Sequence, residues 1–91
     1  MKNKKILLII GGGIAAYKSL DLIRLLKKNH NEVKTILTKS GKEFVTPLSV
    51  STLTNSESFE DIFSKSSKNE IDHISLSRWA DIIIVMPATA N

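Results

Sequence analysis

The sequence contains no cysteine, which excludes disulfide bonds and zinc sites built from thiolates. Aromatic residues make up only 5% of the 91 positions, and basic residues exceed acidic ones by 13 to 9. The lysines are scattered and do not alternate with aromatic side chains, so a nucleic-acid partner is not expected. The net charge of +4 fits a small anionic ligand, or simply a solvated basic surface.

Long hydrophobic runs are also missing, and no stretch approaches the roughly 20 apolar residues that cross a bilayer. Lysines precede the first apolar run, but that run is shorter than the hydrophobic region of a signal peptide, and no small-residue cleavage site follows it. The sequence therefore predicts a cytoplasmic protein with no membrane partner. Its length predicts a single domain, residues 1–91.

What the sequence does contain is a six-residue run, Lys5–Ile10, with five aliphatic members, of the kind found in strands buried on both faces of a parallel sheet. Three glycines follow it: Gly11, Gly12 and Gly13. A stretch with helical spacing then runs from Ile14 to about Asn29. Glycines let the backbone approach a ligand closely, and the free N–H groups of a first helical turn attract anions. We therefore expect a phosphate site at these glycines.

The expected helix is followed by a second strand. Asn29–Asn31 should end the helix, because asparagine tolerates the left-handed backbone of a C-cap. Val33–Thr38 is the strand, and three candidate anion-binding residues stand at its end: Thr38, Lys39 and Ser40. The carboxyl ends of parallel strands share one edge of a sheet, so these residues should lie beside the glycines. Helix capping and turn formation are the alternative roles of their hydroxyls.

The middle of the chain predicts shorter elements. Ser40 can cap a short helix over Lys42–Val45, and Thr46-Pro47 is typical of the start of another helix, which should end near Leu53. The segment Asn55–Asn69 is polar and almost without periodicity. It predicts a loop that carries at most a short edge strand.

The last third of the chain predicts one or two helical turns around Leu76 and Trp79, followed by a strand over Ile82–Met86 that is buried on both faces. Pro87–Asn91 would form a third small-residue loop. Three strands that end in three such loops predict an α/β fold with a doubly wound parallel sheet. Trp79 and Phe44 are expected to pack in the core or in an interface.

The residues at the end of the second strand indicate which class of nucleotide would bind. Gly11-x-Gly13-x-x-Ala16 matches the dinucleotide fingerprint, which also requires an acidic residue at that position to bind the ribose. Thr38 and Lys39 stand there instead, and Glu32 lies at the other end of the strand. A hydroxyl and a cation suit a phosphate better than a ribose diol. The pattern favours a mononucleotide.

Five segments carry a resemblance to a known family, in this order: Gly12–Lys18, Thr38–Ser40, Phe44–Leu48, His73–Asp81 and Pro87–Asn91. Together they resemble the homo-oligomeric flavin-containing cysteine decarboxylases, and most closely the phosphopantothenoylcysteine decarboxylase domains of bifunctional coenzyme A biosynthesis flavoproteins. The segments His-Ile-x-Leu-x-Arg-Trp-Ala-Asp and Pro-Ala-Thr-Ala-Asn are specific to this family, whereas the glycine loop is not.

The resemblance implies a flavodoxin-like fold, FMN as the cofactor, and trimers or multiples of trimers. Such enzymes oxidise the cysteine side chain of phosphopantothenoylcysteine to a thioaldehyde, which eases the loss of carbon dioxide, and the reduced flavin then returns the electrons. Matching positions assign the following residues to FMN: Gly11, Gly12, Gly13, Thr38, Lys39, Ser40, Thr89, Ala90 and Asn91. His73 would be the catalytic histidine. Without the resemblance, two interpretations of His73 stay open: an imidazole that takes up a thiol proton, or a histidine on the protein surface.

Family members also contain a Pro-x-Met-Asn segment that binds the substrate carboxylate and a flap with a cysteine, and this sequence has neither. We therefore expect it to represent the N-terminal, FMN-binding part of a decarboxylase, truncated relative to the family, inactive alone and completed by a complementary chain. The alternative is a non-catalytic FMN-binding fragment or a regulatory subunit of the same fold. A third interpretation, a prenyl-FMN synthase, is less favoured, because the segment around His73 is typical of the decarboxylases.

Overall fold

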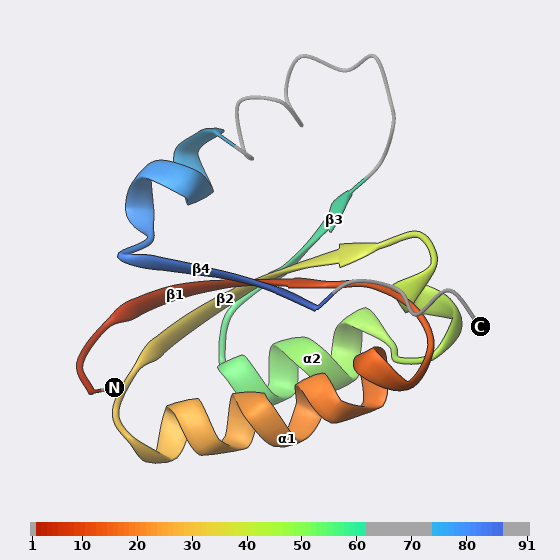
Figure 1. The fold of residues 1–91 in the computed structure, drawn as a ribbon, viewed down its shortest axis with the longest axis horizontal. Helices are drawn as coiled ribbons and strands as arrows, with labels where there is room; N and C mark the ends of the chain where they lie inside the picture. The colour runs from red at the N-terminus through yellow and green to blue at the C-terminus, as the bar shows by residue number, and fades with distance from the viewer. Residues whose placement is uncertain (1, 62–73, 87–91) are drawn as a thin grey trace.

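The computed structural model describes residues 2–61 and 74–86 (Figure 1). The elements are β1 (Lys5–Ile10), α1 (Ile14–Lys28), β2 (Glu32–Thr38), the 3-10 helix η1 (Gly41–Glu43), α2 (Pro47–Thr54), β3 (Ser58–Asp61) and β4 (Ile82–Met86). A further short helical segment spans residues 74–79. None of the helices described is long and apolar enough to cross a membrane.

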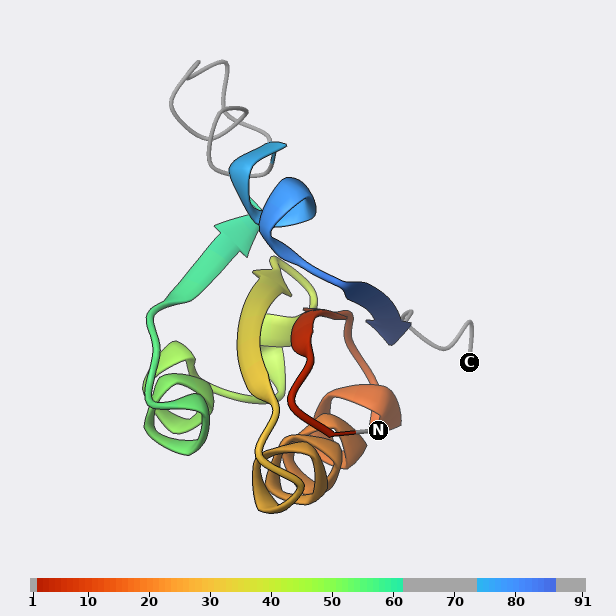
Figure 2. The ribbon, with the colours of Figure 1, turned by 90° about the vertical axis from the view of Figure 1, so that its left-hand side faces the viewer.

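The four strands form one parallel sheet in the order β3-β2-β1-β4. Figure 2 shows α1 and α2 on one face of this sheet and the helical segment 74–79 on the other. The doubly wound, flavodoxin-like α/β architecture is therefore confirmed. The chain places β2 and β3 on one side of β1 and then returns to place β4 on the other side. Ligands of doubly wound sheets bind at the carboxyl edge where the strand order reverses in this way.

The aliphatic character of β1 explains its central place. Ile6, Leu8 and Ile10 are fully buried towards α1 and α2, and Leu7 is buried on the opposite face. The larger core lies between the sheet and the two helices: Ile6, Leu8, Ile10, Ala16, Ile23, Leu26, Val33, Leu37, Val45 and Val50. The smaller core, on the other face, consists of Leu7, Ile36 and Leu76. Strands β1 and β2 therefore fix the frame that positions the loops at their carboxyl ends.

The end of α1 differs in detail from the sequence prediction. The helix ends at Lys28 with Asn29 as its C-cap, close to the expected position, but the left-handed residue is His30, with φ 64°. His30 is exposed, as expected. The side chain of the buried Asn31 donates to the Leu26 carbonyl (3.0 Å) and accepts from the Lys4 N–H (3.0 Å). Asn31 thus links the end of α1 to the start of β1. The neighbouring sequence did not predict this role.

Replacing Asn31 with alanine is expected to lower the free energy of unfolding by about 2 kcal/mol, because two side-chain hydrogen bonds are lost and the Lys4 N–H loses its partner. The total free energy of unfolding of a domain of this size is roughly 5–14 kcal/mol. Denaturant titration of the two proteins measures the difference. Asn29→Ala is the matched control, because the side chain of Asn29 makes no hydrogen bond within the described part of the chain. Equal losses in both variants would contradict the anchoring role.

The start of α2 follows the prediction. Thr46 is its N-cap and accepts from the Ser49 N–H (3.0 Å), and Pro47 occupies the first helical position. The short helix expected over residues 42–45 is instead the 3-10 helix η1, and the side chain of Ser40 makes no capping bond to it. A single three-residue turn is too short to need that cap. The short edge strand anticipated within Asn55–Asn69 is β3; residues 62–69 lie outside the described part.

The prediction that Ile82–Met86 is buried on both faces is wrong. On the side of the larger core, Ile82, Ile84 and Met86 are only partly buried, and the side chains on the other face are exposed. Ile83 is 48% exposed and Val85 is 56% exposed. The reason is that β4 is an outermost strand, and the helical segment 74–79 packs its Leu76 over β1 and β2 rather than over β4. The rings of Phe44 and Trp79 also lie outside the two buried cores.

Candidate functional site

The glycine loop begins at the point where the strand order reverses. The Gly11 N–H donates to the Met86 carbonyl (2.7 Å), so the loop after β1 starts beside the end of β4. Gly13 is the N-cap of α1 and has a φ of 72°, in the left-handed region that favours glycine. It supplies no side-chain cap, and the first turn of α1 holds no acidic residue. Within the described part of the chain, the positive end of this 15-residue helix is therefore suited to bind an external anion.

The second loop is folded back on itself. The Thr38 hydroxyl accepts from the Gly41 N–H (3.1 Å), which closes a turn at the end of β2. Thr38 is half-buried, whereas Lys39 and Ser40 are exposed. Thr38 therefore forms a turn, which was the alternative role of its hydroxyl. Among the described residues this hydroxyl is used as an acceptor, and its O–H can donate to a ligand.

The two loops are in direct contact at the carboxyl edge of the sheet. An added Cβ on Gly12 would lie 2.1 Å from Ser40 Oγ and 3.2 Å from the Ser40 carbonyl oxygen. An added Cβ on Gly41 would lie 2.7 Å from the Ile10 carbonyl oxygen and 3.1 Å from that of Gly11. Each loop can approach the other this closely only because it contributes a glycine. The Ser40 hydroxyl is thereby held over the backbone of Gly12.

Two rings span the same pair of loops on the outside. Tyr17, near the start of α1, and Phe44, just after η1, stack edge to face with centroids 5.9 Å apart. Both rings are partly exposed. The pair fastens the start of α1 to the end of η1, next to Gly13 on one side and Gly41 on the other.

The structure therefore brings Gly11–Gly13 together with Thr38–Ser40. The other predicted site residues, His73, Thr89, Ala90 and Asn91, lie outside the described residues, so their roles stay predictions. Sequence reasoning gave no role to Gly41, although its signal was present: it is the only glycine outside the first loop, and it follows Ser40 directly. Its importance comes from a contact with the other loop.

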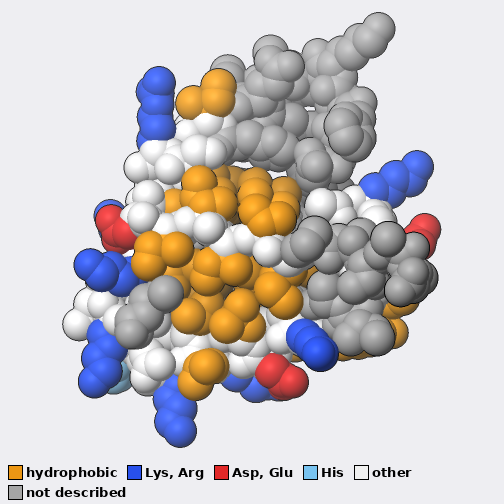
Figure 3. All heavy atoms as spheres, viewed as in Figure 1, with side chains coloured by type: hydrophobic (Ala, Val, Ile, Leu, Met, Phe, Trp, Pro, Cys, Tyr) orange, Lys and Arg blue, Asp and Glu red, His pale blue; other side chains and the backbone are white. Residues whose placement is uncertain are grey.

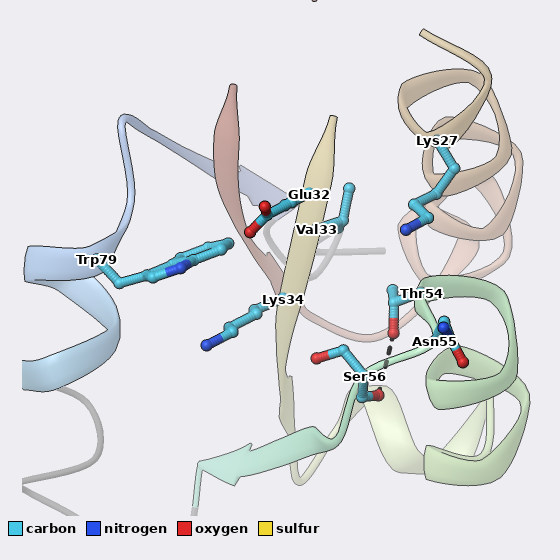
Figure 4. A pocket seen from close by; sticks show the side chains of 8 residues that line it. All are labelled: Lys27, Glu32, Val33, Lys34, Thr54, Asn55, Ser56 and Trp79. Carbon is cyan, nitrogen blue, oxygen red and sulfur yellow. Dashed lines mark hydrogen bonds between the residues drawn. The ribbon is translucent and has the colours of Figure 1, made fainter. Parts of the chain in front are cut away.

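A pocket of about 210 Å³ lies at the opposite edge of the sheet (Figure 4). Its lining residues come from the start of β2, the ends of α1 and α2, and the helical segment: Lys27, Glu32, Val33, Lys34, Thr54, Asn55, Ser56 and Trp79. The Lys34 ammonium lies 4.6 Å from the centroid of the Trp79 ring, a cation–π contact. Because the glycine loop follows the carboxyl end of β1, this pocket is separate from the two-loop site.

Comparison with known proteins links the chain to a family and a fold. The family model described as Flavoprotein matches residues 1–91. The coenzyme A biosynthesis bifunctional protein CoaBC of Vibrio vulnificus strain YJ016 is 43% identical over all 91 residues, which make up 23% of its length.

Solved structures also match this chain, and two of them illustrate the shared fold. MrsD from Bacillus sp. HIL-Y85/54728 superposes on 99% of this chain and 51% of its own, with a TM-score of 0.75 and 27% identity. The FMN-dependent cysteine decarboxylase SpaF superposes on 97% of this chain and 51% of its own, with a TM-score of 0.73 and 20% identity. The chain thus spans about a quarter of the bifunctional relative and about half of each solved chain.

Proposed function

Because this chain belongs to the flavoprotein family, we propose that residues 1–91 are the FMN-binding part of a decarboxylase that converts 4'-phosphopantothenoylcysteine to 4'-phosphopantetheine in coenzyme A biosynthesis. The single observation that carries the proposal is the contact between the glycine loop and the Thr38–Ser40 loop at the carboxyl edge. The substrate is suggested by the relative of 43% identity, whose name places it in coenzyme A biosynthesis.

FMN suits this edge better than a dinucleotide. The end of β2 carries Thr38 and Lys39, where a dinucleotide site would need a carboxylate for the ribose. The Gly12 backbone lies against the Ser40 hydroxyl, and the N-cap of α1, Gly13, supplies no side-chain cap. These N–H and O–H groups can donate to the phosphate oxygens of FMN, and Lys39 can neutralise part of the phosphate charge.

In the proposed reaction, FMN would supply a two-electron oxidation of the cysteine side chain and, after the loss of carbon dioxide, would return both electrons, so that the conversion is redox-neutral overall. His73 is assigned to take up the thiol proton, which an imidazole can do near neutral pH. Thr89, Ala90 and Asn91 are assigned to contact the flavin. The groups that bind the substrate carboxylate would come from a complementary polypeptide, and the whole would assemble as a homo-oligomer. We expect the 91-residue chain alone to bind FMN and to release no carbon dioxide.

The proposal predicts that the purified chain retains FMN through desalting, measured by the visible absorbance of oxidised flavin. Riboflavin is the matched control ligand, because it carries the same ring without the phosphate. We expect FMN to bind at least about 100-fold more tightly, since two or three charge-assisted hydrogen bonds are lost with the phosphate. Equal affinity for both ligands, or no binding of either, would overturn the assignment of the two loops. Flavin binding without turnover in the completed protein would identify a non-catalytic subunit instead.

A further inference from the structure

The pocket of Figure 4 lies where β2 extends beyond its neighbour β3. Pairing between the two strands begins at Thr35 and Ser58, so the first three residues of β2 have no partner on β3. Figure 4 shows Lys34 and Trp79 on one side of β2 and Lys27 on the other. The pocket is therefore bounded by both faces of the sheet. Its volume of about 210 Å³ is smaller than that of sites for drug-sized molecules, and suits a small ligand.

Buried residues give this pocket a defined wall. Val33 and Thr54 both line it, and each is only 2% exposed. The Thr54 hydroxyl donates to the Ser56 carbonyl oxygen (3.1 Å), which holds the segment after α2 beside the pocket. Asn55 is the left-handed C-cap of α2, with φ 56°. The side chains of Asn55 and Ser56 add amide and hydroxyl groups that can donate hydrogen bonds to a ligand.

Two ammonium groups and one carboxylate also line the pocket, those of Lys27, Lys34 and Glu32. None of the three forms an ion pair within residues 2–61 and 74–86. The Lys34 ammonium contacts the ring of Trp79 instead, at 4.6 Å from its centroid. A cation beside a ring keeps its charge and its N–H donors. Within the described part of the chain, these three charges are therefore available to a ligand.

The surroundings of the pocket are positively charged. Segments 2–5, 27–34, 54–57 and 78–81 are joined at this edge by hydrogen bonds and by the pocket itself. They carry seven basic and three acidic residues, a net charge of +4 that equals the net charge of the whole chain. Figure 3 shows most of the visible Lys and Arg side chains on the side where β1 begins in Figure 1. The C-terminal ends of α1 and α2 also lie here, but each contributes only about half a negative charge. The excess of basic residues is larger, so the pocket attracts an anion.

We propose that this pocket binds inorganic phosphate in its hydrogenphosphate form. Lys27 and Lys34, together with the side chains of Asn55 and Ser56, supply N–H and O–H donors to the phosphate oxygens. The Glu32 carboxylate can only accept, and near neutral pH hydrogenphosphate still carries one proton that it can donate to this carboxylate. Sulfate and the dianion of a phosphate monoester carry no such proton, so Glu32 repels them. The site is separate from the two-loop site and does not depend on the proposed function.

The test uses the fluorescence of Trp79, which is the only tryptophan of the chain and lines the pocket. The full chain is titrated with inorganic phosphate, sulfate and methyl phosphate at slightly alkaline pH, with chloride keeping the ionic strength constant. Saturating FMN keeps phosphate out of the two-loop site, and the titration is repeated without FMN. We expect a saturable change with phosphate in the millimolar range or below. Sulfate and methyl phosphate should bind at least about tenfold more weakly.

Three variants separate the pocket from a general effect of surface charge. Lys27→Gln should weaken phosphate binding at least about tenfold, because a charge-assisted hydrogen bond is lost. Lys28→Gln is the matched control, since it removes the same charge from the neighbouring exposed residue, which does not line the pocket. Its affinity should stay within about twofold, because salt screens the more distant charge. Glu32→Gln should abolish the preference for phosphate over sulfate, because an amide N–H can donate to either anion.

Three results would overturn the phosphate proposal: no saturable fluorescence change with phosphate, equal losses in Lys27→Gln and Lys28→Gln, or an unchanged preference over sulfate in Glu32→Gln. Flavin absorbance of the same samples is recorded separately. A chain that binds phosphate with these preferences but retains no FMN would count against the proposed function and leave the phosphate pocket standing. A chain that binds FMN without a phosphate response would do the reverse.

Discussion

Replacing Gly41 with alanine is expected to lower the affinity for FMN at least about 100-fold while most of the sheet stays folded. The new methyl group would lie 2.7 Å from the Ile10 carbonyl oxygen and 2.9 Å from Leu37 Cδ1. A backbone carbonyl at the end of β1 cannot rotate away as a side chain can, so the Thr38–Ser40 loop must shift outward. The Ser40 hydroxyl then leaves its place over Gly12, and the two loops no longer converge on one phosphate.

The control for this variant must separate lost binding from lost stability. Val50→Ala removes buried methyl groups from α2, which belongs to neither loop, and should cost about 1–3 kcal/mol of unfolding free energy. We expect it to keep its FMN affinity. Titration of both variants with FMN, with far-UV circular dichroism to confirm folding, makes the comparison. Wild-type affinity in Gly41→Ala would mean that contact between the loops does not build the site.

Replacing His73 with asparagine in the completed decarboxylase is expected to lower kcat by about 10²–10⁴-fold, the range typical of a lost general base. Asparagine keeps a polar side chain of similar size but cannot take up a proton near neutral pH. Bound FMN should be unchanged in amount and in visible spectrum, because the role assigned to His73 concerns the thiol and not the phosphate. Carbon dioxide release from 4'-phosphopantothenoylcysteine measures the effect.

His30→Asn is the matched control for this experiment. His30 is exposed and has a φ of 64°, a conformation that asparagine tolerates well, so the substitution should leave folding and turnover unchanged. If the His73→Asn enzyme retains full kcat, His73 is not the catalytic proton acceptor. A variant that loses its flavin as well would indicate a positioning role for His73 instead.

The sequence by itself determined the features that depend on neighbouring residues. The aliphatic run of β1 has the pattern of a strand buried on both faces, and Thr46-Pro47 has the chemistry that starts a helix. The arrangement of strands followed by small-residue loops was enough to predict a doubly wound sheet and to place Gly11–Gly13 and Thr38–Ser40 at one edge. These features could be predicted because spacing, capping and strand composition act over a few residues.

Only the tertiary structure decided the features that depend on contacts between distant segments. The close approach of Gly41 to Gly11 joins loops that follow different strands, and Asn31 bonds to Lys4 across 27 positions. The exposure of Ile83 and Val85 depends on what stands beside β4, and an apolar run has the same sequence whether or not its neighbour is present. Burial and steric fit belong to pairs of surfaces, so they become definite only once the chain has brought those surfaces together.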